Sequence, residues 1–255
     1  MRFARAEATL ESAAHTSTGP PGPEDKTSFV QGRPGDLRRA TPWHRYGHHI
    51  RTLPARLEDL SRDLQLKASS RILDYGCAEV PYRHFFPAEA EYVAADIPGN
   101  PHATLELNAD ATVPAPDDSF DVVISTQVLE HVADPALHLA ESFRVLRPGG
   151  RMLLSTHGVF IYHPDPIDHW RWTCAGLRHV VEEAGFRVVR FEGIIGLVAT
   201  GLQLVQDATY YRVPRWLRPV YAFVMQSLCV LADRVQKQSS RDLNAQVFGL
   251  VAEKP

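Results

Sequence analysis

Cysteine is scarce in this sequence. The 255 residues include only Cys77, Cys174 and Cys229, and no two of them have C-x-x-C spacing. Neither a disulfide framework nor a cysteine-based zinc site is expected, and a reducing compartment such as the cytoplasm fits best. Three histidines lie between residues 44 and 49. No cysteine or carboxylate cluster accompanies them, so no metal site is expected.

Long apolar runs and an excess of positive charge are also missing. No run reaches the roughly 18 apolar residues that span a bilayer, and the first residues lack an apolar stretch of signal-peptide length. Lys and Arg number 27 against 30 Asp and Glu, which argues against a nucleic-acid-binding surface. The remaining composition, 44% hydrophobic and 22% charged, is typical of a soluble protein with one sizeable α/β domain.

Residues 1–40 differ from the rest of the chain. They contain two stretches rich in glycine and proline and few large apolar side chains. Such a segment cannot bury enough surface to offset the entropy of ordering, so we expect it to be disordered. Residues 41–255 are expected to form one domain. Within 43–66, apolar residues recur at helical steps, and Pro54 is expected to begin a second helical part.

From residue 71 onward, short apolar runs alternate with helical segments. One helix is expected to begin after Asp134 and to end at Pro148–Gly150, with an apolar stripe of core residues, and another covers 173–184. The alternation predicts an α/β, Rossmann-like sheet, mostly parallel, with helices on both faces. The stripe consists of Leu137, Ala140, Phe143 and Leu146, and the strands are expected at 71–75, 91–96, 103–107, 119–125, 151–156, 187–191 and 246–252.

An apolar and aromatic segment, about 193–238, interrupts the expected connection between the last two strands. It is interpreted as two or more helices. A lid over the acceptor pocket is the preferred function of these helices, and a dimer surface is the next alternative. The third is a membrane-surface patch, in which Trp216 and Tyr221 would lie beside Arg215 and Arg218 at the headgroup layer. The oligomeric state stays open.

The most informative stretch is Arg71–Pro81, where a short apolar run ends at Gly76, with Asp96 at the end of the next apolar run. A glycine lets the backbone approach a ligand closely, and a carboxylate can accept two hydrogen bonds from a ribose diol. This layout predicts a nucleoside-binding crevice at the carboxyl edge of a parallel sheet. The alternative for Asp96 is a plain turn residue at a strand end.

The motifs that follow, taken in order, resemble those of the class I S-adenosylmethionine-dependent methyltransferases. The resemblance covers about residues 70–190 and the final strand. It implies a seven-stranded sheet whose last strand is antiparallel, and S-adenosylmethionine as cofactor. The matching pieces are Ile72–Ala78, Tyr92–Asp96, Asn108–Ala111, Asp118–Val132 and Arg144–Gly150.

The resemblance also implies which residues bind the cofactor. Asp96 would hold the ribose hydroxyls, and Asp110, for which an Asx turn is the alternative, would meet the adenine amino group. The methionine end and tail would lie along the other residues. The implied set is Asp74, Gly76, Ala78, Asp96, Asp110, Ala111, Ser125 and Gln127.

The chain departs from the family in the loop after Gly76. The family commonly has further glycines where this chain has Ala78 and Val80. We expect close approach of a cofactor at Ala78 to require a negative φ. The departure leaves open a second function, a binding or regulatory protein of the same fold. A nicotinamide-dependent oxidoreductase is disfavoured, because the loop has no G-x-G-x-x-G.

Transfer of a methyl group from a sulfonium is an in-line displacement, so the protein has to align the acceptor and exclude water. A hydroxyl acceptor is helped by a general base, which is most often histidine. The candidate bases are His131, His157 and His163, for which packing or a solvent-exposed loop position is the alternative. The candidate substrate-binding residues, which could equally pack the loop or form a structural salt bridge, are Trp170, Arg171 and Trp172.

A narrower resemblance concerns Pro81–Arg83 and the loop His163–Thr173. They resemble a bacterial subgroup, with a loop of the HPxPxDxWRWT type, associated with glycan and envelope biosynthesis. The sequence therefore predicts a cytoplasmic enzyme, with peripheral membrane contact as an option. It would transfer a methyl group from S-adenosylmethionine to a small-molecule or glycan acceptor, at oxygen.

Overall fold

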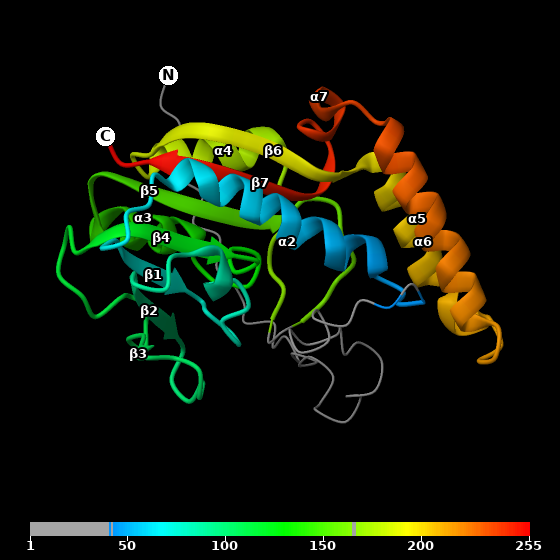
Figure 1. Cartoon of the computed structure of the whole chain (residues 1–255), viewed down its shortest axis with the longest axis horizontal. Coiled ribbons are helices and arrows are strands. Elements are labelled where there is room, and N and C mark those ends of the chain that lie inside the picture. Colours follow the sequence, from blue (N-terminus) through cyan, green and yellow to red (C-terminus); the bar gives the residue numbers. More distant parts are fainter. Residues whose placement is uncertain (1–40, 42, 165–166) are drawn as a thin grey trace, which may run out of the picture. The chain divides into compact units, whose positions relative to one another are not determined.

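Seven strands form one sheet in the computed structural model, which describes residues 41, 43–164 and 167–255 (Figure 1). The predicted disordered segment 1–40 lies outside the described residues. The strands are β1 (Arg71–Tyr75), β2 (Glu91–Asp96), β3 (Leu105–Glu106), β4 (Phe120–Thr126), β5 (Leu146–His157), β6 (Arg187–Gly196) and β7 (Ala245–Glu253).

The strand order is β3-β2-β1-β4-β5-β7-β6, and β7 is the one strand of this sheet that runs antiparallel to its neighbours. This arrangement confirms the predicted mostly parallel sheet with an antiparallel last strand. β1 and β2 have the predicted bounds, whereas β3 is shorter than 103–107. β5 begins earlier than predicted, because Leu146 already pairs with Phe120 before a bulge interrupts the register.

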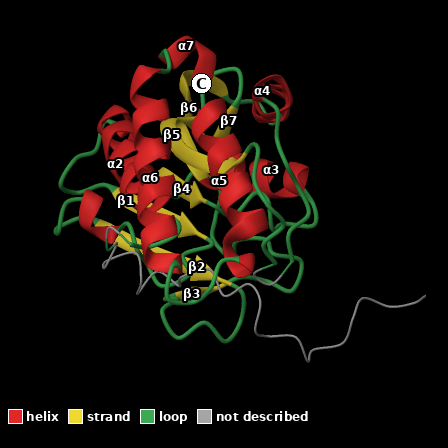
Figure 2. Ribbon diagram, turned by 90° about the vertical axis from the view of Figure 1, so that its right-hand side faces the viewer, coloured by secondary structure: helices red, strands yellow, loops and turns green. Residues whose placement is uncertain are grey.

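Helices cover both faces of the sheet. Helix α2 (Gly47–Ser61) lies on one face, and α3 (Pro135–Val145) and α4 (Cys174–Glu183) lie on the other, as Figure 2 shows. Successive strand residues point to opposite faces, so Ile72 packs in the cluster beneath α2 and Leu73 in the cluster beneath α3 and α4. The sheet therefore separates two apolar cores.

Two predicted helix boundaries are wrong. Pro54 does not begin a second helical part but lies inside α2, where Leu53 and Leu57 on either side of it are buried. Their burial offsets the hydrogen bond that a proline cannot donate. α3 ends at Val145 rather than at Pro148–Gly150, because Leu146 is already extended and joins β5.

The apolar stripe predicted for α3 is only partly in the core. Ala140 is exposed, and Leu137 lines the cavity described below. The buried face of the helix includes His138 and Ser142 instead. Their burial is tolerated because both are hydrogen-bonded: the His138 Nε2 lies 2.9 Å from the Ser125 Oγ, and the Ser142 Oγ donates to the His138 carbonyl.

Between β6 and β7 the chain forms α5 (Leu197–Thr209), α6 (Arg218–Val235) and the short α7 (Gln238–Arg241). α5 and α6 pack side by side at one end of the sheet (Figure 1). We call this pair, with its connection 210–217, the helical hairpin.

Glutamines hold the helical hairpin to the rest of the domain. The Gln226 Nε2 on α6 donates to the Gln203 and Gln206 Oε1 atoms on α5, at 2.8 and 2.9 Å, and to the Arg45 carbonyl at 2.8 Å. The Gln226 Oε1 accepts from the His48 backbone N–H at 2.7 Å. All three glutamines are buried. Polar groups therefore fasten the hairpin inward, in addition to the apolar contacts of Ala199 and Cys229 with the core beneath α2.

We predict that Gln226→Leu lowers the free energy of unfolding by about 1–3 kcal/mol, because the buried Gln203 and Gln206 Oε1 atoms and the His48 N–H lose the partner that Gln226 supplies. Urea denaturation measures this change. The neighbouring Ser227, which is exposed, provides the control: Ser227→Ala should stay within about 0.5 kcal/mol of the parent. Equal stability of Gln226→Leu and the parent would refute the fastening role.

Candidate active site

A cavity of about 670 Å³ opens at the carboxyl ends of β1, β2 and β4. Its size lies within the range of roughly 300–1,000 Å³ that is usual for small-molecule sites. The loops after these three strands, the segment after β3 and the first turn of α3 supply its walls. The predicted site residues among its lining are Gly76, Ala78, Asp96, Asp110, Ala111, Gln127 and His131.

The loop after β1 has an unusual backbone. Gly76 has φ +89°, and a Cβ at this position would lie 2.6 Å from the Val128 Cγ2, so only glycine fits there. Ala78 and Val80 also have positive φ, +47° and +55°. The expectation of a negative φ at Ala78 is therefore wrong. The left-handed conformation costs about 1–2 kcal/mol at a non-glycine residue, so the surrounding contacts must hold this loop in place.

The carboxylate of Asp96 is one of those contacts. Its Oδ2 accepts from the Ala78 backbone N–H at 2.9 Å and from the Asn100 side chain at 2.6 Å. Its Oδ1 accepts from the Ile97 N–H at 2.8 Å. The Cys77 Sγ also lies 3.8 Å from the Oδ2, so the acceptor position that remains for a ligand is the second lone pair of the Oδ1.

Asp110 and Ala111 form the far wall of the cavity. The Asp110 Oδ1 accepts from the backbone N–H and the hydroxyl of Thr112, an Asx-type turn that lowers the pKa of Asp110 through these hydrogen bonds. Ala111 has φ +65°, and its carbonyl accepts from the Tyr75 hydroxyl. The turn keeps Asp110 ionised while the carboxylate lines the cavity.

Asp74 and Ser125 are not among the lining residues. Both are buried at the strand ends behind the cavity wall. Burial raises the pKa of Asp74 to about 7, although the Tyr92 hydroxyl donates to its Oδ2 at 2.6 Å. Ser125 pairs with His138, whose pKa burial lowers to about 4. Both residues thus support the cavity wall from behind, and their contact with a cofactor stays a prediction.

Gln127 joins the cavity to the strand β5. Its Nε2 donates to the Ser155 Oγ at 3.0 Å, and its backbone φ of +57° is in the left-handed region. Its buried Oε1 has no hydrogen-bond partner among the described residues. A buried acceptor without a partner in a cavity wall indicates a ligand that donates a hydrogen bond there.

The three predicted bases converge beside the cavity. His131 lines it, whereas His157 and His163 lie deeper and are buried. The ring centroid of His163 lies 5.0 Å from that of His131 and 4.7 Å from that of His157. Burial lowers the pKa of His163 to about 4 and that of His157 well below its usual range, so both rings are neutral. A neutral imidazole can accept a proton or bind a metal.

Arg171 is occupied by its own loop. Its guanidinium forms an ion pair with Asp168 and donates to the carbonyls of Phe160, Ile161 and Trp170. These contacts brace the segment between β5 and α4. The predicted binding of an acceptor anion by Arg171 stays a prediction, since it would need a regrouping of these bonds.

The two tryptophans of the loop differ in their surroundings. Trp170 is exposed, and its Nε1 donates to the Val132 carbonyl at 2.8 Å. Trp172 is half-buried against the core beneath α4. Trp170 therefore lies near the loop that lines the cavity, and Trp172 farther inside, while the substrate contact predicted for both stays a prediction.

Sequence reasoning missed Glu130. Its side chain is fully buried beside His131, and burial raises its pKa to about 7. The Thr156 hydroxyl donates to its Oε2 at 2.9 Å, and the His157 Nε2 lies 3.4 Å from its Oε1. A charged residue next to a candidate histidine was the available signal. It becomes informative only once its burial is known.

Comparison with known proteins agrees with this geometry. A sequence profile described as a methyltransferase domain matches residues 43–190. A Mycolicibacterium smegmatis protein named "Probable S-adenosylmethionine-dependent methyltransferase" is 34% identical over 137 residues, 51% of this chain and 49% of that protein. The chain thus spans about half the length of this relative. The 27-O-demethylrifamycin SV methyltransferase of Amycolatopsis mediterranei is 28% identical over 197 residues, 66% of this chain and 68% of that protein.

A solved structure shows the same fold. Phosphoethanolamine N-methyltransferase 2 of Haemonchus contortus, in complex with S-adenosylmethionine, has a TM-score of 0.51 at 16% identity. The superposition covers 89% of this chain and 60% of that one.

The residues around the cavity fit S-adenosylmethionine. Asp96 has a free acceptor position for a ribose hydroxyl. The unpartnered Gln127 Oε1 can accept from the amino group of the methionine part. Leu107 and Val128 supply apolar wall between these polar groups. By its matching domain, its fold and this cavity, the chain belongs to the S-adenosylmethionine-dependent methyltransferases.

Proposed function

We propose that this protein transfers a methyl group from S-adenosylmethionine to an oxygen of a small-molecule or glycan acceptor. The observation that carries the proposal is the cavity at the carboxyl ends of the parallel strands, whose lining includes the hydrogen-bond acceptors Asp96 and Gln127 and the candidate base His131, with His157 and His163 buried behind His131. Such a site can hold the cofactor and receive a proton from the acceptor within one enclosure.

The cofactor supplies a methyl group already activated by the positive sulfur. The chain's own residues then have two tasks, to align the acceptor and to receive its proton. His131 lies on the cavity wall, and His157 and His163 continue the cluster away from it. Because His157 and His163 are neutral, they do not repel a proton taken up by His131. This lowers the free-energy cost of the proton transfer.

An oxygen acceptor is supported by a relative and by the neutral histidines. The name of the Amycolatopsis relative places the methyl group on an oxygen of a rifamycin. A hydroxyl needs to lose its proton on transfer, which suits a cluster of neutral imidazoles. The glycan part of the proposal rests on the loop His163–Thr173, which resembles a subgroup associated with envelope biosynthesis.

We predict that Asp96→Ala weakens the binding of S-adenosylhomocysteine by about 1–3 kcal/mol, roughly fivefold to a hundredfold, because a ribose hydroxyl loses its partner. Isothermal titration calorimetry measures the affinity. The exposed Glu89, outside the cavity lining, supplies the control Glu89→Ala, which should bind as the parent does. Unchanged affinity in Asp96→Ala would remove Asp96 from the site.

A transfer assay separates an enzyme from a binding protein. Hydroxylated glycans and aromatic alcohols are offered with S-adenosylmethionine labelled in the methyl group. The proposal expects label in an ether of at least one acceptor class. Tight cofactor binding with no transfer to any of them, or label on nitrogen alone, would contradict the proposed oxygen transfer.

We also propose that the helical hairpin rests on a membrane surface at the cytoplasmic side. Its outward face is apolar, while its glutamines point inward. Trp216 in the connection is 78% exposed. None of the helices in the described residues is long and apolar enough to cross a membrane, so the contact would be peripheral. The outward side chains on the two helices are Leu197, Val198, Val205, Val220, Phe223, Val224, Leu228, Leu231 and Val235.

Charge favours a membrane over a second copy of the chain. Arg212 and Arg215 are exposed at one end of α6, and Arg234 and Lys237 at the other. Pairing of two such helices in either direction would bring like charges together, whereas anionic headgroups would neutralise them. A lipid-linked acceptor would be presented at such a surface.

We predict that the protein sediments with vesicles containing phosphatidylglycerol and much less with pure phosphatidylcholine. The double change Phe223→Asp and Leu231→Asp removes two apolar contacts, each worth roughly 1.5–3 kcal/mol, so it should weaken binding at least about tenfold. Val189→Asp alters an exposed valine on β6, away from the hairpin, and should leave binding intact. A stable dimer in sedimentation velocity, with no vesicle binding, would overturn the membrane proposal.

A further inference from the structure

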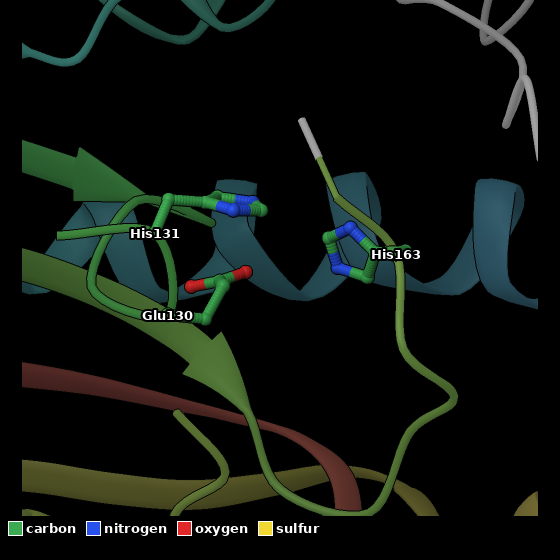
Figure 3. Close-up of side chains that lie close together, drawn as sticks. All are labelled: Glu130, His131 and His163. Atoms are coloured by element: carbon green, nitrogen blue, oxygen red, sulfur yellow. The ribbon is translucent and has the colours of Figure 1, made fainter. Parts of the chain in front are cut away.

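Three side chains from two separate segments meet beside the cavity. Glu130 and His131 lie on the turn after β4, and His163 lies on the segment after β5. Figure 3 shows the three side chains directed toward a common space. One ligand atom from each, a carboxylate oxygen and two ring nitrogens, lies within 4.8 Å of the other two.

Two of these groups are buried with atoms left unpartnered. Glu130 is fully buried and His163 is 8% exposed. The Glu130 Oε1 and the His163 Nε2 have no hydrogen-bond partner among the described residues, and neither does the adjacent His157 Nδ1. Three unpartnered polar atoms in one buried cluster are costly unless something occupies the space between them.

The surrounding contacts leave the lone pairs free. The His131 Nδ1 lies 2.6 Å from the Ile167 carbonyl, which can only accept, so this nitrogen carries the proton. The His131 Nε2 therefore keeps its lone pair, the arrangement found when histidine binds a metal. The Thr156 hydroxyl holds the Glu130 Oε2 at 2.9 Å, which leaves the Oε1 without a hydrogen bond and with the His157 Nε2 3.4 Å away.

The position of His163 is also fixed from behind. Its backbone N–H donates to the Asp168 Oδ2 at 2.9 Å, and Arg171 clamps Asp168. The positive charge of Arg171 is thereby paired within the loop rather than directed at Glu130. Glu130 and His131 thus have the outer hydrogen bonds that metal ligands usually have, and His163 is positioned through its backbone.

We propose that Glu130, His131 and His163 bind a divalent transition-metal ion, with zinc as the best match. Two imidazoles and one carboxylate form a known set for catalytic zinc, which keeps a coordination position open. Atoms bound to zinc at about 2.0–2.1 Å are separated by roughly 3.3 Å in a tetrahedral site, so the group would draw together on binding. Magnesium, which prefers oxygen, does not suit two imidazoles.

This site deepens the proposed function and rests on it: His131 would then be a metal ligand, and the metal in place of His131 would activate the acceptor hydroxyl. His131 lines the cofactor cavity, so the open coordination position would face the acceptor. The metal would bind the acceptor hydroxyl and lower its pKa, and the proton would leave to water in the cavity. The oxygen then forms its bond to the methyl carbon while the carbon–sulfur bond breaks, and its electron pair goes to sulfur. The products are a methyl ether and S-adenosylhomocysteine.

The first test is metal binding by the full chain without an affinity tag, stripped with a chelator and titrated with Zn²⁺ in a calorimeter. We expect one ion per chain, no binding of Mg²⁺, and at least a tenfold loss of zinc affinity in Glu130→Gln and in His163→Ala. His179 on α4 is exposed and distant in the fold, so His179→Ala should bind zinc as the parent does. A parent that binds no zinc, or loses equal affinity in His179→Ala, overturns the site.

The second test guards against variants that fail to fold. Since Glu130 is buried, each variant is checked by thermal unfolding, and His131→Ala, a change at a partly exposed residue, is examined as Co²⁺ protein. The visible bands of bound Co²⁺ should change in His131→Ala and stay the same in His179→Ala. Unchanged bands in a folded His131→Ala remove His131 from the ligand set.

Binding of S-adenosylhomocysteine in the same samples separates the two proposals. Cofactor binding without zinc binding defeats the metal site and leaves the proposed transferase intact. Zinc binding without cofactor binding defeats the proposed transferase, and with it the role assigned to the metal.

Discussion

The site depends on the parallel pairing of β1 with both β2 and β4. Because the three strands point the same way, the loops that follow them meet at one edge of the sheet. One carboxylate at this edge, Asp96, then fixes the loop after β1 by accepting from the Ala78 N–H. The Asn100 Nδ2 adds a second contact by donating to the Ala78 carbonyl at 2.8 Å, and the two contacts together offset the left-handed backbone of Ala78.

These contacts explain how the chain manages without the family's additional glycines. Ala78 and Val80 adopt the backbone conformation that glycine would take without strain. Hydrogen bonds thus hold the loop in this conformation, whereas glycines at these positions would adopt it without strain.

Some polar side chains of this protein are buried, and some large apolar side chains are exposed. Gln226 and Glu130 are buried, whereas Trp216 and Val235 are among the most exposed residues of the described chain. Buried polar groups lower stability unless their partners are in place. The glutamines have partners within the protein, whereas the Glu130 cluster and the outward face of the helical hairpin do not. These two regions are where ligand and membrane contacts are proposed.

Local patterns in the chain were sufficient for the fold class, since strand and helix periodicity and turn residues act over short distances. Such patterns give the bounds of β1 and β2, the capping of α3 by Asp134 and the placement of Asp96 at the end of β2. The resemblance to a methyltransferase family supplied the antiparallel last strand and the cofactor, because motif order reflects topology. Both agree with the sheet and the matching domain.

Features that depend on contacts between distant parts of the chain could not be predicted from local sequence patterns. Pro54 remains in a continuous helix because a core packs around it, and α3 buries His138 because Ser125 on β4 is its partner. Glu130 and His163 lie 33 positions apart in the sequence, and their approach depends on β4 and β5 being neighbours. Burial, which turns an ordinary Glu-His pair into an unpartnered cluster, is a property of the packed chain and has no signature in residue spacing.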